Sequence, residues 1–394
     1  MKREIHKRWS TDQLITGIQT NDWLRLLRMN GYRVDPTYLH RAAWITGMSL
    51  GASALGAIED VRFGRQLASM EIDPTPLFLI GHWRSGTTHL HNLFGRVPGH
   101  TYPTVYQVVF PGAFLSTGST IPKLTSRLLG DTRSYDNVKH GWGEAAEDEI
   151  ALAKLCGLSP YVAFMFPEHA ARYERYLDFI ECTAEERDTW KDAFRYLIKK
   201  IMFATGGDRV VVKSCTHTAR IRLILEMFPN AKFVHIHRHP YQVYASTLHM
   251  RSHTDWENFF HLPDEDVEQV RSQQTLLIGQ RLYERVVEDR HLIPEGNFYE
   301  LAYEDLVGHE VEVMADIYDK LDLPNWRTAE PEIRRYLRGV RGYRTNRLPK
   351  LDPETRERIQ HYWAPVFEAY RYSPDEIARV EPPAESAAPN QRTS

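Results

Sequence analysis

Hydrophobic positions along this chain switch between two spacings. In residues 10–70, Leu14, Ile15, Ile18 and Leu27 recur at roughly helical spacing, and Asn30-Gly31 marks a break between helices. Short continuous apolar runs follow later, at 77–81, 209–213, 232–237 and 298–303. Runs of this length, rich in branched and aromatic residues, are typical of buried strands.

Helical patterning returns between and after these runs. Helices are expected from Thr87 onward and at 172–203, 219–228, 240–251, 266–290, 308–322 and 353–371. The unit from 209 to 237 reads as strand, helix and strand with a short crossover, which implies parallel pairing. The fold class predicted is therefore α/β, a central parallel β-sheet flanked by helices, with extra N-terminal helices and ligands over the carboxyl ends of the strands.

The domain organisation follows from the same pattern. Residues 1–72 are expected to form a helical region packed on the core, and Pro74 and Pro76 separate it from the first strand. Residues 73–380 are expected to form one α/β domain, since 394 residues with 42% hydrophobic content can bury a large core. The tail 381–394, rich in Pro, Ala, Ser, Asn and Gln, is expected to be disordered.

Charge and cysteine content exclude several classes of protein. The 49 basic and 52 acidic residues leave a net charge of −3, so no global field favours nucleic acid as a partner, and any anion site must be local. Cys156, Cys182 and Cys215 show no metal-binding spacing and are too few for a disulfide scaffold. A reducing compartment, and hence a cytoplasmic location, is expected.

Residues 42–58 carry no charge and are rich in small side chains. A transmembrane helix needs about 20 apolar residues, and Gly, Ser and Thr dilute this stretch, so a buried or surface-docked helix is expected rather than a membrane span. The N-terminal residues also lack the apolar core of a signal peptide. Peripheral membrane contact and the oligomeric state stay open.

The strand run at 77–81 leads into a glycine-bounded loop typical of phosphate binding. Gly81 and Gly86 keep the spacing of a Walker A loop, but Thr87 stands where that loop has its lysine. The cation lies inside the loop instead, at Arg84. The loop is therefore expected to bind an anionic group without a metal ion and without the γ-phosphate chemistry of an ATPase.

Two later strand runs also end in cations, at Lys213 and Arg238. A single cation at a strand end is usually a solvated cap, but parallel strands bring both of these to the edge that carries the phosphate loop. The segment from His235 to Pro240 adds further potential cations, and Ser246 follows Arg238 in the next helix. A second phosphate could bind there.

Together these elements resemble the sulfotransferases that use 3′-phosphoadenosine 5′-phosphosulfate. The resemblance covers about 77–323 and depends on the order of Arg84-Ser-Gly-Thr-Thr88, Lys213, Arg238 with Ser246, and Tyr303-Glu-Asp-Leu306. It implies a P-loop-like fold in which Arg84, Ser85, Gly86, Thr87 and Thr88 bind the 5′-phosphosulfate, and Arg238 and Ser246 bind the 3′-phosphate. It also places His89 and Tyr303 near the adenine.

Sulfuryl transfer to a hydroxyl needs cations near the bridging oxygen and a base near the acceptor. Lys213 is the residue expected at the bridging or sulfuryl oxygens, with Arg84 sharing that role. The segment Glu-Asp-Glu-Ile-Ala-Leu that begins at Glu147 resembles one in bacterial members of the family, so Glu147 is favoured as the base, with His217 as its rival and His91 third. Cys215 stands where soluble eukaryotic members have a histidine. Two simpler interpretations stay open: the acidic run around Glu147 is a solvated helix face, and His217 caps a helix.

The sequence leaves alternatives for the reaction and for its acceptor. A P-loop kinase would need the missing lysine and a magnesium ligand, and a non-catalytic nucleotide-binding protein would not need Lys213 or a base. The aromatic stretch 101–170 is either an irregular lid or acceptor pocket, or ordinary core under long loops. An apolar small-molecule or lipid-like hydroxyl acceptor is favoured over a polysaccharide.

Overall fold

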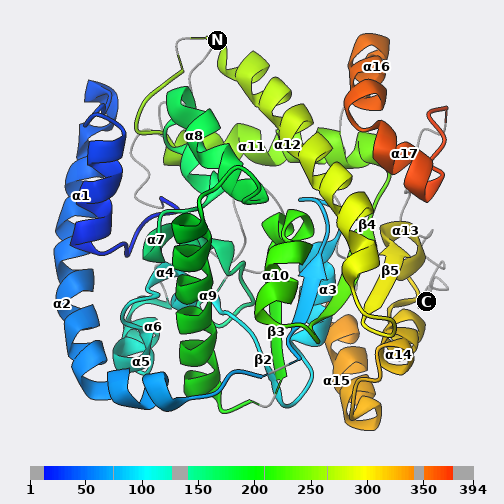
Figure 1. The fold of residues 1–394 in the computed structure, drawn as a ribbon, viewed down its shortest axis with the longest axis horizontal. Helices are drawn as coiled ribbons and strands as arrows, with labels where there is room; N and C mark the ends of the chain where they lie inside the picture. Colours follow the sequence, from blue (N-terminus) through cyan, green and yellow to red (C-terminus); the bar gives the residue numbers. More distant parts are fainter. Residues whose placement is uncertain are drawn as a thin grey trace, which may run out of the picture.

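A five-stranded parallel sheet lies at the centre of the protein (Figure 1). The computed structural model describes residues 13–73, 75–126, 141–207, 209–263, 265–340 and 350–375. The strands are β1 (Leu77–Ile80), β2 (His100–Thr101), β3 (Arg209–Lys213), β4 (Lys232–His237) and β5 (Phe298–Ala302). All pairings are parallel, in the order β2-β3-β1-β4-β5, which confirms the predicted α/β class.

The strand order creates a switch point at β1. The chain passes from β3, on one side of β1, to β4 on the other side. In the registers, Leu79 lies opposite Lys213 and Ile80 lies opposite His235. Connections that leave neighbouring strands in opposite directions open a crevice at their carboxyl ends, which is where ligands bind in such sheets.

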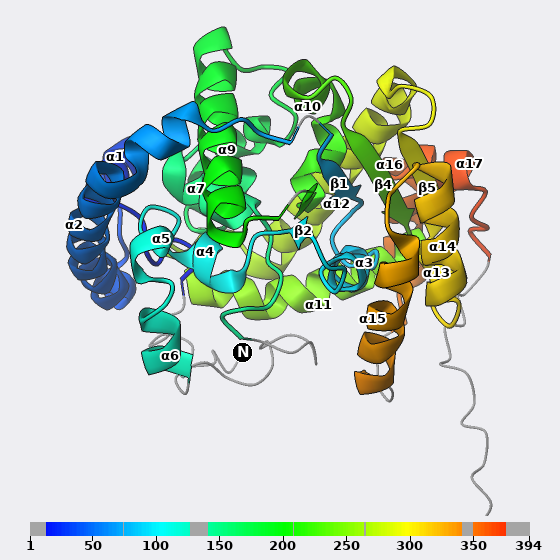
Figure 2. The same ribbon diagram turned by 90° about the horizontal axis from the view of Figure 1, so that it is seen from below.

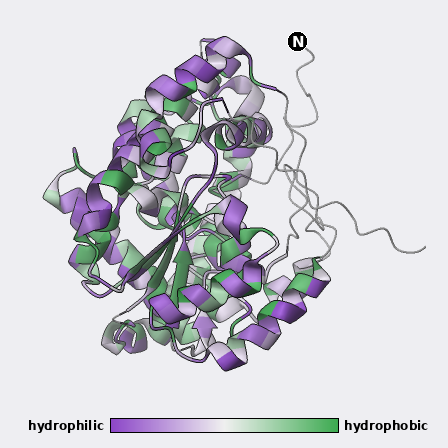
Figure 3. Ribbon diagram, turned by 90° about the vertical axis from the view of Figure 1, so that its right-hand side faces the viewer, coloured by the Kyte–Doolittle hydropathy of each residue, from purple (hydrophilic) through white to green (hydrophobic). Residues whose placement is uncertain are grey.

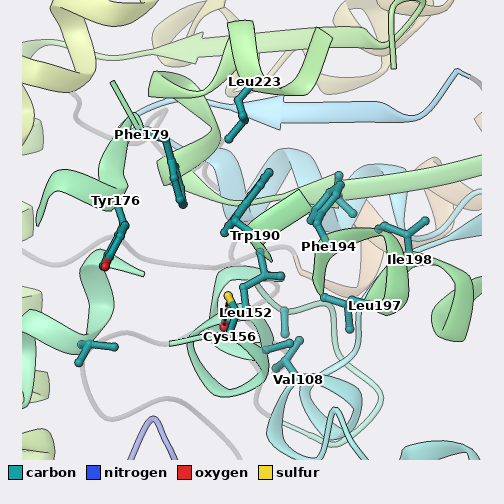
Figure 4. Packing of buried hydrophobic residues seen from close by; sticks show 14 of the residues in the cluster. Val108, Leu152, Cys156, Tyr176, Phe179, Trp190, Phe194, Leu197, Ile198 and Leu223 are labelled. Carbon is teal, nitrogen blue, oxygen red and sulfur yellow. Dashed lines mark hydrogen bonds between the residues drawn. The ribbon is translucent and has the colours of Figure 1, made fainter. Parts of the chain in front are cut away.

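The two faces of the sheet are covered by different helices, and the strands form a hydrophobic interior between them (Figure 3). One face, with Phe78 and Val212, joins a cluster that includes Trp190 and Phe194 of α9 (Ala184–Thr205), whose packing is seen in Figure 4. The other face packs on α3 (Thr87–Phe94), α14 (Glu310–Lys320) and α15 (Trp326–Gly339). Alternate strand residues therefore enter separate cores, as the pleat of a strand requires.

The N-terminal helices lie along one edge of the molecule (Figures 1 and 2). They are α1 (Thr20–Met29), the short η2 (Pro36–Tyr38) and the 31-residue α2 (Leu39–Ser69). Trp23 and Ile45 belong to the same apolar cluster as Phe78 of the sheet, so the predicted extra helices are present and share its core. The division into 1–72 and 73–380 stays a prediction, and 381–394 lies outside the described residues.

The uncharged stretch 42–58 is the middle of α2. In the described parts of the chain, no helix combines the length and the hydropathy needed to cross a membrane.

The described parts of the stretch 101–170, residues 101–126 and 141–170, form short helices with buried or half-buried aromatic side chains. Tyr106, Phe114, Tyr161 and Phe166 are each 5% exposed or less, so these four are core residues. The helices are α4 (Val105–Val109), α5 (Phe114–Thr117), α6 (Ile121–Thr125), α7 (Glu149–Leu155), η4 (Pro160–Phe164) and η5 (Pro167–His169).

The predicted helix at 172–203 is wrong at its start. The chain forms α8 (Ala170–Glu174) and η6 (Arg175–Leu177), turns through Phe179 at a φ of +60°, and begins α9 behind Thr183. The Thr183 hydroxyl accepts a hydrogen bond from the amide of Glu186, whose carboxylate accepts one from the Thr183 amide. This capping box fixes the new start of the helix.

Most remaining helices match the predicted positions. The matches are α10 (Ile221–Met227), α11 (Pro240–Asn258), α12 (Val267–Asp289) and α14; the short η7 (Cys215–Ala219) precedes α10, and η8 (Arg290–Leu292) follows α12. The helix α13 (Tyr303–Leu306) follows β5, and the predicted helix at 353–371 is divided at Trp363 into α16 (Pro353–Tyr362) and α17 (Ala364–Tyr370). Elements that were not predicted include α13, the two-residue β2 and α15, which contains Pro331.

Candidate active site

The loop between β1 and α3 is held in a tight, specified conformation. The Gly81 amide donates to the Thr218 hydroxyl at 2.7 Å, and a Cβ on Gly81 would lie 2.3 Å from the Ile236 carbonyl oxygen. Arg84 and Gly86 both adopt left-handed backbone, at φ values of +69° and +104°. Only glycine takes up such a conformation readily, so the structure accounts for Gly86 but requires Arg84 to be held by its contacts.

Ser85 shapes this loop from within. Its side chain is fully buried, and both its amide and its hydroxyl donate to the carbonyl of His82. The Ser85 hydroxyl therefore already has an acceptor within the loop, and its contact with a phosphosulfate stays a prediction.

The start of α3 offers unpaired backbone amides. Gly86 is the N-cap and contributes no side-chain cap, and the first amide bonded back to it belongs to Leu90. The amides of Thr87, Thr88 and His89 precede that bond, so they have no acceptor within the helix. Such an end, with its partial positive charge, is suited to an anion.

Two arginines, Arg84 in the loop after β1 and Arg238 directly after β4, meet beside this helix end. Arg84 donates through Nε to the Ser246 hydroxyl at 2.9 Å, and Arg238 donates through Nη1 to the Arg84 carbonyl at 3.2 Å. The Arg238 guanidinium lies 4.3 Å from the centre of the Tyr303 ring. A Cβ on Gly86 would be 2.4 Å from that same ring. The structure thus brings Arg84, Gly86, Arg238, Ser246 and Tyr303 together at one edge of the sheet.

Arg238 retains hydrogen-bonding capacity. It is 9% exposed, and burial lowers the pKa of its guanidinium, while Tyr303 and Glu304 act in the opposite direction. Its Nε is buried and has no hydrogen-bond partner among the described residues. A buried donor of this kind is costly unless a ligand accepts from it, which fits a site for an anion.

A second group of polar residues lies next to the first. Lys213, 2% exposed, donates through Nζ to Glu147 Oε1 at 2.7 Å and to the Thr88 hydroxyl at 3.4 Å. The other carboxylate oxygen of Glu147 accepts a hydrogen bond from the Tyr161 hydroxyl, which itself accepts from Trp83 Nε1 at 2.9 Å. Glu147 therefore lies between Lys213, at the end of β3, and Tyr161, which is hydrogen-bonded to the loop between β1 and α3.

His217 is placed apart from this group. Its Nε2 lies 2.7 Å from Asp148 Oδ2, and both side chains are fully buried. The rings of Phe78, Trp190 and Phe194 surround it at edge-on angles. His217 thus belongs to the aromatic core behind the sheet, although it is close to Lys213 in the sequence.

The acidic run at 147–149 is not a solvated helix face. Its three carboxylates take three different partners: Glu147 binds Lys213, Asp148 binds His217, and Glu149 is fully buried in a bidentate pair with Arg220. Of the three, only Glu147 is accessible, with 19% of its side chain exposed.

The other histidines have partners outside this group. His89 Nε2 lies 3.3 Å from Glu310 Oε1, and His91 is 1% exposed, edge-on to Tyr102. His237 stacks on Tyr370 at 4.0 Å, and burial, together with His235, lowers its pKa to about 3. The expectation that the 235–239 segment adds cations beside Arg238 is therefore wrong for His237.

Trp83 and Tyr161 were not singled out from the sequence. Trp83 lies inside the glycine-bounded loop, but an indole ring is not expected to bind phosphate, so the sequence offered no reason to select it. Tyr161 was one aromatic residue among many between 101 and 170. No spacing rule links it to Glu147, because their contact depends on how η4 packs against the start of α7.

Comparison with known proteins identifies the family. A match to the sulfotransferase family spans residues 76–328. The chain is also 33% identical, over 371 residues and 94% of each chain, to the omega-hydroxy-beta-dihydromenaquinone-9 sulfotransferase Stf3 of Mycobacterium bovis and of Mycobacterium tuberculosis. The chain belongs to the sulfotransferase family. It is therefore an enzyme that transfers sulfuryl groups, which decides against the kinase and the non-catalytic alternatives.

Solved sulfotransferases share this fold. STF1 from Mycobacterium tuberculosis superposes with a TM-score of 0.63 at 18% identity, covering 87% of this chain and 92% of that one. STF9 from Mycobacterium avium gives 0.64 at 16% identity, covering 91% and 97%. The helices outside the central sheet are thus largely included in the common architecture.

Proposed function

We propose that this sulfotransferase moves the sulfuryl group of 3′-phosphoadenosine 5′-phosphosulfate to a hydroxyl of a lipid-like acceptor. The observation that carries the proposal is the meeting of Arg84, Arg238 and Ser246 beside the open amides of α3, with the Lys213–Glu147 pair next to them. A site with two arginines that follow separate strands suits a ligand with two anionic groups.

The donor-binding roles follow from these positions. The amides of Thr87 and Thr88 and the guanidinium of Arg84 would hold the 5′-phosphosulfate, and Gly86 gives the loop the turn that exposes them. Arg238, with its free Nε, and Ser246 would hold the 3′-phosphate. Tyr303 and His89 are proposed to contact the adenine, Tyr303 with the stronger support because it lies against Arg238 and Gly86.

The transfer itself would use Lys213 and Glu147. Glu147 would accept the proton of the acceptor hydroxyl as the acceptor oxygen bonds to sulfur and the bond between sulfur and the bridging oxygen breaks. Lys213, with Arg84, would stabilise the negative charge that develops on the bridging oxygen. We prefer Glu147 over His217 as the base because His217 is fully buried and paired with Asp148. The buried position of His91 argues against it in the same way.

The proposed acceptor rests on the relative. The name of Stf3 specifies a hydroxylated menaquinone derivative, and this chain matches 94% of that protein at 33% identity. An apolar alcohol of this kind is therefore proposed in preference to a polysaccharide.

The direct test incubates the purified chain with the phosphosulfate donor and two acceptor sets, hydroxylated isoprenoid quinols and soluble saccharides. Mass spectrometry should show one added sulfuryl group on a lipid alcohol, and Glu147→Gln should form that product far more slowly. Sulfation of the saccharides alone would contradict the proposed lipid-like acceptor. Magnesium-dependent phosphorylation with ATP as donor would contradict the proposed sulfuryl transfer.

We propose in addition that the outer side of α2 rests on a lipid surface. Trp44, Leu50, Ile58 and Val61 are 43%, 61%, 52% and 89% exposed. Of the ionisable residues in and next to this stretch, Arg41 and Glu59 are each 1% exposed, and the exposed Asp60 accepts a hydrogen bond from Tyr196 on α9. Arg62 and Arg65, exposed in the following turn, would meet anionic head groups.

Sedimentation with vesicles tests this contact. The wild-type chain should bind vesicles that contain anionic lipid, and Leu50→Glu with Ile58→Glu should lose most of that binding. Leu124→Glu, at a 76% exposed position on α6, is the matched control and should bind as the wild type does. Equal binding by all three proteins, or a concentration-dependent dimer that only the α2 variant loses, would overturn the lipid contact.

A further inference from the structure

We infer that Tyr161 is a positioning residue that orients Glu147 for the transfer, with Trp83 fixing the tyrosine in turn. The inference rests on the proposed function, because it gives Glu147 the role of base. It assigns a role to Tyr161 and Trp83, which are not among the residues proposed to bind the donor.

The contact joins three separate parts of the chain. Tyr161 lies on η4, Glu147 precedes α7, and Trp83 belongs to the loop after β1. Tyr161 is 5% exposed, its hydroxyl donates to Glu147 Oε2, and it accepts from Trp83 Nε1 at 2.9 Å. A buried tyrosine hydroxyl needs partners, and here both of its roles are filled.

The direction of this hydrogen-bond chain is fixed by chemistry. Indole Nε1–H can only donate, so the Tyr161 oxygen must accept from Trp83 and its one proton is left for Glu147. Burial and the neighbouring charge of Glu147 raise the pKa of Tyr161 well above its usual value, so the proton stays on the phenol. Tyr161 therefore acts as a permanent donor to one oxygen of the carboxylate.

The backbone around Glu147 is anchored independently of Tyr161. The next two residues, Asp148 and Glu149, are bound to His217 and Arg220. Loss of the Tyr161 hydroxyl should therefore leave the location of Glu147 unchanged and free the rotation of its carboxylate. A base that is free to rotate spends less time in the geometry that proton transfer needs.

The same hydrogen bonds couple the base to the donor loop. This series of hydrogen bonds starts at Trp83, inside the loop, and passes through Tyr161 and Glu147 to Lys213. It returns to the loop at Thr88, at the start of α3. Arg84, Ser85 and Gly86 lie between those two ends in the sequence. The segment that would bind the phosphosulfate thus also holds the acceptor base from both sides.

Kinetics of Tyr161→Phe test the inference. The variant keeps the ring and removes only the hydroxyl, so kcat should fall by about tenfold or more while the KM for donor and acceptor stay close to the wild-type values. Tyr173→Phe is the matched control: Tyr173 is fully buried and its hydroxyl accepts from Asn30 at 2.7 Å, remote from Glu147. That control should keep the wild-type kcat.

A double variant shows whether Tyr161 acts through Glu147. In a Glu147→Gln background, which should be slow on its own, Tyr161→Phe should cost little more, because the group that it orients has lost its function. Trp83→Phe should give a smaller loss of kcat, and it provides a second reading if Tyr161→Phe fails to fold in a melting experiment.

The outcomes separate this inference from the proposed function. Wild-type kcat in Glu147→Gln would remove the base assignment itself. A slow Glu147→Gln together with a wild-type kcat in Tyr161→Phe would overturn only the positioning role. The positioning role would also be overturned if Tyr161→Phe lowered kcat by the same factor in the wild-type and Glu147→Gln backgrounds. A change confined to the KM for the donor would overturn it too.

Discussion

At the scale of single residues, the protein contains buried cations of two kinds. Lys200 is fully enclosed, with Glu59 and the Pro111 carbonyl as partners, so its role is structural. Lys213 is just as buried but contacts Glu147, which is 19% exposed, and Thr88 in the first turn of α3. The difference lies in the partners, because only those of Lys213 border the proposed donor site.

Replacing Lys213 should therefore affect rate more than binding. In Lys213→Ala the cation that stabilises charge on the bridging oxygen is lost, and kcat should fall by about 100-fold or more. Affinity for 3′-phosphoadenosine 5′-phosphate, measured by calorimetry, should change far less, since the arginines and amides remain. An equal loss of rate and affinity would show that Lys213 only binds the donor.

Replacing Lys200 should have the opposite profile. Lys200→Met leaves the Glu59 carboxylate buried with only the Ser116 amide, which donates to it at 2.7 Å. Breaking a buried pair in this way costs about 3–5 kcal/mol of unfolding free energy. Urea unfolding should show that loss, and kcat at a permissive temperature should stay near the wild-type value; an unchanged midpoint would contradict the account.

Some site residues could be predicted from the sequence because strand ends meet at one edge of a parallel sheet. Arg84, Lys213 and Arg238 are of this kind. Tyr161 and Trp83 could not be predicted, because their contact with Glu147 depends on packing between elements distant in sequence. His217 lies four residues after Lys213, but η7 turns its ring into the aromatic core.

At the scale of elements, the donor loop depends on a glycine at its end. Gly86 has a φ of +104°, and a Cβ there would meet the Tyr303 ring at 2.4 Å. Because Tyr303 is part of the proposed donor site, the loop, α3 and the start of α13 cannot be altered separately.

Gly86→Ala should consequently weaken donor binding by about tenfold or more, as the new methyl group displaces Tyr303 or the loop. Gly99→Ala is the control, since Gly99 has a φ of +85° with nothing within 4 Å of its would-be Cβ. That variant carries backbone strain alone, of about 1 kcal/mol. Calorimetry that finds the same donor affinity for both variants would contradict the close packing of the loop.

The elements also differed in how well the sequence predicted them. Strands with continuous apolar runs and helices with regular spacing were found. The strand β2 has only two residues, and α15 carries a proline and six charged residues in fourteen, so neither gives a clear pattern. The break between η6 and α9 depends on a capping box inside a stretch that otherwise looks helical.

At the scale of the whole molecule, the buried His82 and the half-buried His237 link stability to pH. Burial lowers the pKa of His82 to about 4, where it lies between Tyr283 and Trp363, and burial lowers the pKa of His237 to about 3. Both stay neutral in the folded protein, whereas in the unfolded chain they take up protons below about pH 6.5. The unfolded state then binds more protons, so stability falls as the pH falls.

Unfolding free energy should therefore decline from about pH 6.5 toward pH 4, by at most about 1.4 kcal/mol per pH unit for each histidine. Urea titrations across this range should show a shallower decline for His82→Phe and His237→Phe. His291→Gln, at an exposed position, should follow the wild type. A stability that rises with acidity in this window would contradict the neutral state of the two rings.

The central claim is that the edge of the sheet with Arg84 and Arg238 binds an adenosine donor that carries two anionic groups. Titration of 3′-phosphoadenosine 5′-phosphate and of adenosine 5′-phosphate into the wild type, Arg238→Ala and the surface control Arg222→Ala tests it most directly. The wild type and the control should prefer the bisphosphate, and Arg238→Ala should lose about 10- to 100-fold of affinity for it alone. Unchanged bisphosphate affinity in Arg238→Ala would contradict the account.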